Sequence, residues 1–375
     1  MPKLLNRISE WSDALMSRTA VQFDEHRVET GHEDVVRAFL SYLGRVPEND
    51  EVINFHIRHF PTVVSLTEAL QHSAEHRSRR ELITQPGKGT FTVDQIEDAR
   101  KAFLTGQVEE FRGKVLQLPE WYDVTLDPDS VAYRDQILKF WSAITGRQNY
   151  NPSLDEDTPE VVDQDFLYRP AFYASGDVEM AGAHLLAIGH ILMRSNLPKG
   201  GRVLEYGAGF GQTSLNFARS GAKVDVVDIN RAFVKGVNRA SRMFRTDLKS
   251  HLGSFGINPA GEPHAYDVIL FYESFHHCLN AAELIATMKT LLKPGGCVIM
   301  AGEPIVSSPI PEIPYSWGIR LDFENIAIMR DRGWMELGYQ EPYLYHLFHR
   351  AGFRSEFFGD ANSHWAQVYR FTAPN

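Results

Sequence analysis

The sequence has few cysteines and no long apolar runs. Its only two cysteines, Cys278 and Cys297, do not have the spacing of a metal or redox motif, which argues against a disulfide scaffold. No apolar stretch approaches the ~20 residues that a membrane-spanning helix needs. The N-terminus shows neither the apolar core nor the cleavage signal of a secretory leader. We therefore expect a soluble, cytoplasmic protein.

An excess of basic residues is also missing. The 375 residues carry a formal net charge of -10, which argues against strong non-specific binding to nucleic acid. Hydrophobic residues make up 43% of the chain, enough for a sizeable core. The length predicts two domains, or one domain with a large extension. We expect the main binding partner to be a small molecule or glycan acceptor.

A glycine-rich turn is the most informative feature of the sequence. Gly207, Gly209 and Gly211 follow a short apolar strand and precede a helical run. A second strand, at 224–227, then ends at Asp228. Such a strand–turn–helix–strand unit lets backbone amides approach an adenosine-bearing ligand, and a carboxylate at this place accepts hydrogen bonds from ribose. Taken alone, the turn would also suit an ordinary α/β sheet.

The last glycine of the dinucleotide fingerprint is absent, because Gln212 stands where G-x-G-x-x-G requires glycine. Glu205 precedes the turn, and its carboxylate would repel a pyrophosphate but suit a sulfonium cation. The pattern resembles the first motif, E/D-x-G-x-G-x-G, of the class I S-adenosylmethionine-dependent methyltransferases. The resemblance implies a set of cofactor-binding residues: Glu205, Gly207, Ala208, Gly209, Gly211, Asp228, Ile229, Ser254, Phe255 and Glu273.

Further segments resemble the same family. The Leu-Lys-Pro-Gly-Gly turn that ends at Gly296 precedes a hydrophobic strand, and two strands near the C-terminus resemble the closing antiparallel hairpin. The resemblance implies an α/β fold over residues 171–375, with a Rossmann-like, mostly parallel seven-stranded sheet. In many members an acidic residue after the third strand receives the adenine amino group. Ser254 and Phe255 stand there instead, so the adenine contact is left open.

Two adjacent histidines follow the fourth predicted strand. His276 and His277 stand at its carboxyl end, where an acceptor should meet the methyl group, and histidine suits a general base near neutral pH. Either is the candidate base, and the other could pack or hold a loop. Glu273 could orient a histidine or touch the cofactor. A metal site formed with Glu303 is the alternative, but we expect no metal.

The segment 304–345 is longer than an ordinary connection, which indicates a functional insert. Tyr315, Trp317 and Arg320 are its candidate acceptor-binding residues, because aromatic faces beside charged groups suit a sugar. A lid packed by its own aromatic residues is the alternative. The Asn/Asp-Pro-Pro-Tyr motif of nucleic-acid amino-methyltransferases is absent, which argues against DNA as the acceptor.

The N-terminal region, residues 1–150, is predicted to be all-helical. Leu43-Gly-Arg-Val-Pro47 resembles the L-G-R-x-P signature of a small bacterial helical module, over about 31–80, that is often fused to enzymes of glycan and cell-surface synthesis. Ser65 and Glu68 form a capping-box pattern at the start of a helix. Residues 151–170 are predicted to be a linker. The N-terminal helices could dock a partner or support a homodimer.

These observations favour an S-adenosylmethionine-dependent O-methyltransferase that acts on a sugar or a cell-surface glycan intermediate. A small-molecule methyltransferase of secondary metabolism is the first alternative. A non-catalytic cofactor-binding or scaffold protein is the second, although the intact Glu205, glycine turn and Asp228 argue against loss of binding.

Overall fold

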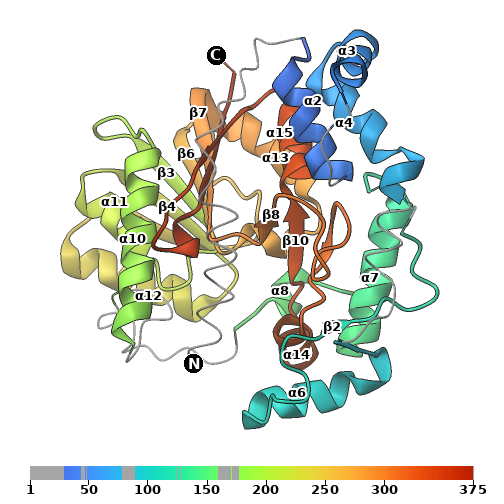
Figure 1. The fold of residues 1–375 in the computed structure, drawn as a ribbon. Helices are drawn as coiled ribbons and strands as arrows, with labels where there is room; N and C mark the ends of the chain where they lie inside the picture. The colour runs from blue at the N-terminus through green and yellow to red at the C-terminus, as the bar shows by residue number, and fades with distance from the viewer. Residues whose placement is uncertain are drawn as a thin grey trace.

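The fold is shown by a computed structural model of the chain (Figure 1). The structure describes residues 29–43, 47, 49–77, 89–124, 126, 128–158, 170 and 177–374. Gly44 to Val46 of the expected module signature lie outside the described residues, as does most of the expected linker.

A seven-stranded sheet forms the centre of the C-terminal half. Its strand order is β11-β12-β7-β6-β3-β4-β5. The strands are β3 (Arg202–Tyr206), β4 (Lys223–Asp228), β5 (Leu248–Leu252), β6 (Tyr266–Tyr272), β7 (Leu292–Ala301), β11 (Arg354–Phe358) and β12 (Val368–Thr372). Strands β3 to β7 are parallel, and β12 runs antiparallel to both β7 and β11. The predicted Rossmann-like sheet is confirmed.

Helices cover both faces of this sheet. The apolar runs of β3, β6 and β7 are buried, as expected for parallel strands covered on two sides. One face carries α10 (Val178–Arg194), α11 (Gln212–Arg219) and α12 (Arg231–Phe244), and the other carries α13 (Ala281–Leu291) and α15 (Glu341–Arg350) (Figure 1). Since the order of the strands reverses between β3 and β6, their carboxyl ends open the crevice where open α/β sheets bind ligands.

The first described helices form a small core of their own. They are α2 (His32–Ala38), the π-helical turn η1 (Phe39–Leu43), α3 (Asp50–His59) and α4 (Val63–Gln71). The predicted start of α4 at Ser65 is wrong by a few residues. Thr62 caps this helix, because its Oγ1 accepts a hydrogen bond from the Ser65 amide at 3.1 Å, and Ser65 in turn accepts from the Thr62 amide.

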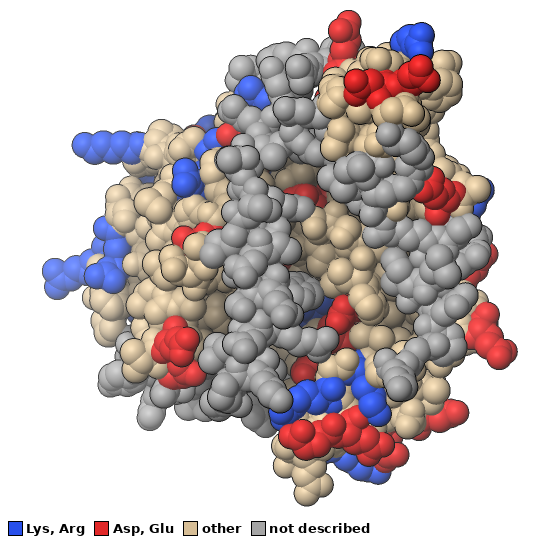
Figure 2. Space-filling view, in the orientation of Figure 1, with Lys and Arg blue, Asp and Glu red and all other residues tan. Residues whose placement is uncertain are grey.

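The remaining N-terminal elements pack against the insert. They are β1 (Thr90–Phe91), η2 (Val93–Gln95), α6 (Ile96–Thr105), β2 (Val115–Leu116), α7 (Val131–Thr145) and α8 (Pro152–Asp155). The insert supplies β8 (Ile305–Val306), β9 (Trp317–Ile319), α14 (Phe323–Arg332) and β10 (Leu337–Gln340). Acidic and basic side chains gather together where α6 and α14 lie (Figure 2), and ion pairs join the two helices. Phe111 stacks on Phe323, and the Trp141 indole donates to the Gly333 carbonyl at 2.8 Å. One hydrophobic core therefore runs across the division that the sequence placed near residue 150.

Replacing the fully buried Trp141 with alanine tests this shared core. We expect Trp141→Ala to lower the free energy of unfolding by about 3–5 kcal/mol, because a large buried side chain leaves a cavity. Urea unfolding followed by circular dichroism measures this, with the exposed Leu104→Ala as control. A separate early transition that leaves the unfolding of the sheet unchanged would show that residues 89–158 fold apart from the insert.

Candidate active site

A cavity of about 790 Å³ lies at the carboxyl ends of β3, β4 and β6. Its volume is in the range of small-molecule and cofactor sites. Most of the predicted cofactor residues line it: Glu205, Gly207, Ala208, Gly209, Asp228, Ile229, Ser254, Phe255 and Glu273. Gly211 does not line it but caps the N-terminus of α11. Of the two candidate bases, His277 lines the cavity and His276 is buried behind it.

The turn between β3 and α11 requires glycine for two reasons. Gly207, Gly209 and Gly211 have φ values of 66°, 51° and 70°, a region that L side chains rarely adopt. A Cβ atom on Gly207 would lie 2.8 Å from the Ser274 Cβ. The Gly209 amide donates to Asp228 Oδ2 at 3.1 Å, so the turn and the β4 carboxylate hold each other in place.

Two buried carboxylates face the cavity. Burial raises the pKa of Glu205 to about 7, although a hydrogen bond from the Ser214 hydroxyl acts in the opposite direction. Burial likewise raises the pKa of Asp228 to about 6, against the amides of Asn230 and Gly209, which donate to its two oxygens. A cation bound nearby would stabilise the ionised form of both carboxylates.

Glu273 occupies a strained position at the end of β6. Its φ of 52° lies in the left-handed region, which is uncommon for a residue with a side chain. Its Oε1 accepts a hydrogen bond from the Trp365 indole at 2.9 Å, and the Trp365 ring stacks on His184 at 4.2 Å. Burial raises the pKa of Glu273 to about 8. Glu273 thus lines the cavity. The carboxylate that orients a histidine is a different one, that of Glu303.

The carboxylate of Glu303 holds the short helix η3 (Phe275–His277) that carries both histidines. It accepts hydrogen bonds from the amides of Ser274, Phe275 and His276 at 2.8, 2.8 and 3.1 Å. It also faces the His276 Nδ1 at 2.8 Å. Burial opposes its ionisation, but His276 and these amides outweigh burial and lower the pKa of Glu303. One buried carboxylate therefore fixes both the turn and the ring of His276.

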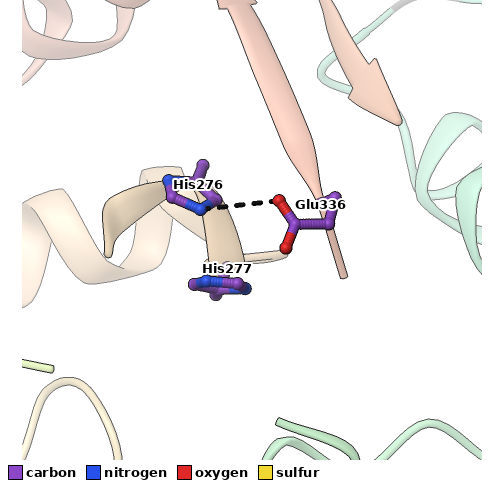
Figure 3. A group of neighbouring side chains, drawn as sticks. All are labelled: His276, His277 and Glu336. Atoms are coloured by element: carbon purple, nitrogen blue, oxygen red, sulfur yellow. Dashed lines mark ion pairs between the residues drawn. The ribbon is translucent and has the colours of Figure 1, made fainter. Parts of the chain in front are cut away.

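His276, His277 and Glu336, here called the histidine cluster, lie close together (Figure 3), and of the three only His277 lines the cavity. His276 Nε2 lies 3.6 Å from Glu336 Oε2, and Arg320 also contacts that oxygen. His277 Nδ1 lies 3.0 Å from Glu156 Oε2, as an ion pair without hydrogen-bond geometry. Within the described residues the three side chains of the cluster offer one ligand atom each, all within 4.8 Å of one another.

The two adjacent imidazoles differ in charge. Burial lowers the pKa of His276, and the neighbouring His277 adds to this effect. Burial also acts to lower the pKa of His277, but the carboxylates of Glu156, Glu336 and Glu303 outweigh it and raise this pKa to about 9. Without a ligand, His277 is therefore protonated at neutral pH and His276 is neutral.

Three predicted acceptor-binding residues lie away from the cavity. Tyr315 and Trp317 are buried in the core, where Trp317 donates to the Pro128 carbonyl at 2.9 Å. Arg320 contacts Glu336 and Asn325. None of the three lines the cavity, because the insert folds its aromatic residues against α7 and the residues before it. This placement agrees with the alternative of a segment packed by its own aromatic residues.

Residues 156–158 were expected to be linker, but Glu156 and Thr158 line the cavity. Asn230, just beyond β4, donates to Asp157 Oδ1 and to the Thr158 carbonyl, both at 2.8 Å. Glu156 Oε1 accepts from the Tyr150 hydroxyl at 2.6 Å and from the Met335 amide at 2.7 Å. This segment therefore joins the end of the crevice beside Asp228 to the insert.

Comparison with known proteins finds a match in the C-terminal half of the chain. Residues 183–356 match the family model of a methyltransferase domain. This part of the chain is therefore similar to methyltransferase domains. The predicted fold is confirmed, and the match agrees with the predicted enzyme class and methyl donor.

The curated relatives match part of this domain. The ubiquinone biosynthesis O-methyltransferase of Vibrio cholerae is 28% identical over 116 residues, which cover 31% of this chain and 47% of that protein. The Xanthomonas campestris protein of the same name is 30% identical over 112 residues, 30% of this chain and 46% of that protein. The matched segment thus spans about half the length of these relatives.

Solved structures are similar to this chain at lower sequence identity. The CurJ carbon methyltransferase has a TM-score of 0.42 and 15% identity, over 80% of this chain and 89% of that chain. The 1,6-didemethyltoxoflavin-N1-methyltransferase of Burkholderia thailandensis has a TM-score of 0.40 and 16% identity, over 58% and 93%. These likenesses are too distant to bear on the site. Among the described helices, none has the length and apolar character to cross a membrane.

Cofactor affinity should depend on pH through Glu205 and Asp228. Because the pKa values of both carboxylates are raised, to about 7 and about 6, they gain their charge only as the pH rises through that range. We expect the domain to bind S-adenosylmethionine about tenfold more tightly at about pH 8 than at about pH 5.5. Calorimetric titration at both pH values measures this, with Glu205→Gln as the variant that loses part of the dependence. Equal affinities would contradict the account.

Proposed function

We propose that the chain is an S-adenosylmethionine-dependent methyltransferase that methylates a hydroxyl oxygen of a small acceptor with an apolar body. The observation that carries this proposal is the cavity at the edge of a methyltransferase domain, lined by the glycine turn, Glu205 and Asp228. In this proposal the methionine end of the cofactor lies at the turn. Asp228 accepts hydrogen bonds from the ribose, and Ile229, Ser254 and Phe255 surround the adenine.

The rest of the cavity wall supports an apolar acceptor. It includes Leu138 from α7, Leu279, Leu284, Ile328 from α14, and Trp334. The curated relatives are named for ubiquinone biosynthesis and for O-methylation, which agrees with oxygen as the methylated atom. We therefore place an aromatic or similarly apolar hydroxyl compound first.

A sugar or glycan intermediate is the second candidate. Asn280, Glu283 and Thr287 give the same wall hydrogen-bonding groups that sugar hydroxyls need. The aromatic residues on which the sugar was first predicted, Tyr315 and Trp317, lie in the core instead.

The reaction is an in-line displacement in which the protein positions the partners and removes one proton. The acceptor oxygen attacks the sulfonium methyl carbon, a C–O bond forms, and the S–C bond breaks with its electron pair left on sulfur. The products are the methyl ether and S-adenosylhomocysteine. We assign the proton to the Glu156 carboxylate, which lines the cavity and is oriented by His277, 3.0 Å away. His276 does not line the cavity, and its part in this proposal is to hold its neighbours in the histidine cluster in place.

Replacing Asp228 tests the cofactor pose. We expect Asp228→Ala to weaken S-adenosylmethionine binding at least about tenfold, because two ribose hydroxyls lose a charged acceptor. Isothermal titration calorimetry measures it, with Asp247→Ala at an exposed position as the matched control. Unchanged affinity in Asp228→Ala would mean that the ribose binds elsewhere.

Replacing His277 separates chemistry from cofactor binding. We expect His277→Ala to lower the rate of methyl transfer by about 10² or more, while S-adenosylmethionine affinity changes less than about threefold. His264→Ala, which removes an exposed histidine that does not line the cavity, serves as control. Full turnover in His277→Ala would remove this residue from the mechanism.

An acceptor screen decides between the candidate functions. The protein is incubated with cofactor labelled on its methyl group, and with phenolic compounds in one set and sugar nucleotides or glycolipids in the other. We expect label in the phenolic set, and label in the sugar set alone would favour the second candidate. The scaffold alternative predicts no label in either set. A cytoplasmic location, and a homodimer or a partner docked on the N-terminal helices, stay predictions.

A further inference from the structure

We propose that the histidine cluster binds a divalent transition-metal ion through His276 Nε2, one nitrogen of His277 and a carboxylate oxygen of Glu336. The three side chains come from two segments far apart in the sequence, the tip after β6 and the residue before β10 (Figure 3). His276 and Glu336 are buried, and His277 lines the cavity.

The distances suit a metal centre. The three ligand atoms lie within 4.8 Å of one another, and His276 Nε2 is 3.6 Å from Glu336 Oε2. Two ligands at about 2.1 Å from a tetrahedral ion are about 3.4 Å apart. Small rotations of the side chains therefore bring these atoms to coordination distance, with no change of the backbone.

The surrounding groups orient the ligands as at known metal sites. Glu303 accepts from His276 Nδ1 at 2.8 Å, which directs Nε2 toward Glu336. A carboxylate behind a ligating histidine is the usual partner in such sites, and it fixes both the tautomer and the ring. Arg320 holds Glu336 through Oε2, and no described residue forms a hydrogen bond with its Oε1. That oxygen is available as a ligand.

The electrostatic balance also calls for a cation. The side chains of Glu156, Glu303 and Glu336 are only 8%, 1% and 6% exposed. Two positive charges stand against these three carboxylates: Arg320, which contacts Glu336, and the protonated His277. Glu156 Oε2 and His277 Nδ1 are both buried and lie 3.0 Å apart, but without the geometry of a hydrogen bond. Buried charges without full pairing are unfavourable, and a divalent ion would balance them.

Two imidazoles and one carboxylate select the type of ion. This ligand set suits Zn²⁺ and similar first-row ions, while Mg²⁺ prefers oxygen ligands alone. Three protein ligands leave a fourth position, which His277 places toward the cavity. If the proposed function holds, the acceptor oxygen fills that position and loses its proton more readily, with Glu156 as proton acceptor. Only this last consequence rests on the proposed function.

Metal titration of the untagged full chain tests the site without an acceptor. The protein is stripped with a chelator, then titrated with Zn²⁺ and, in parallel, with Mg²⁺, and the heat and the bound metal per chain are measured. We expect one Zn²⁺ per chain and no comparable binding of Mg²⁺. Visible absorption of the Co²⁺ form gives an independent signal of the ligand set.

Variants separate this site from adventitious binding. We expect His276→Ala and Glu336→Gln to weaken Zn²⁺ binding at least about tenfold, and Glu303→Gln to weaken it about 10- to 100-fold. His264→Ala should bind as the natural chain does. Each sample is also titrated with S-adenosylmethionine, so that retained cofactor binding shows an intact fold.

The outcomes are distinct. The absence of Zn²⁺ binding, or equal binding by His276→Ala, Glu336→Gln and the natural chain, overturns the metal site while the methyltransferase proposal stands. Stoichiometric Zn²⁺ binding that these variants lose supports the site, even if no sample binds S-adenosylmethionine and the proposed function fails.

Discussion

The burial of two carboxylates in the wall of the cavity is the constraint on which the rest of the site depends. Glu205 and Asp228 keep their positions through the Ser214 hydroxyl and through backbone amides, including that of Gly209 in the turn. Their charge is unfavourable there until a cation arrives. This explains why the turn is built from glycines, which let amides reach the β4 carboxylate, and why a sulfonium cofactor suits this cavity better than a pyrophosphate.

The end of the cavity where we propose that the acceptor binds is assembled from three distant segments. The tip after β6 supplies His277, residues 156–158 supply Glu156, and the insert supplies Trp334, while His276 and Glu336 lie behind the cavity lining. The N-terminal half is thus more than an appended module, because α7 and the segment after α8 share a core with the insert and complete the cavity. A change that loosens this shared core would displace the groups that face the acceptor.

The sequence predicts what is local and misses what depends on tertiary packing. Glu205, the glycine turn and Asp228 lie within one strand–turn–helix–strand unit, so their spacing alone indicates the site. Glu156 pairs with His277 from a segment that its composition marks as linker, and no local pattern signals that pairing. Tyr315 and Trp317 were expected at the acceptor, but composition cannot say whether an aromatic side chain faces a ligand or the core.

A crystal structure of the full chain with S-adenosylmethionine tests the central claim most directly. The account predicts cofactor density along the β3 turn, with the ribose hydroxyls on Asp228, the adenine beside Phe255, and the methyl group pointing toward His277. An empty turn at saturating cofactor, or a nicotinamide dinucleotide bound there in its place, would contradict it.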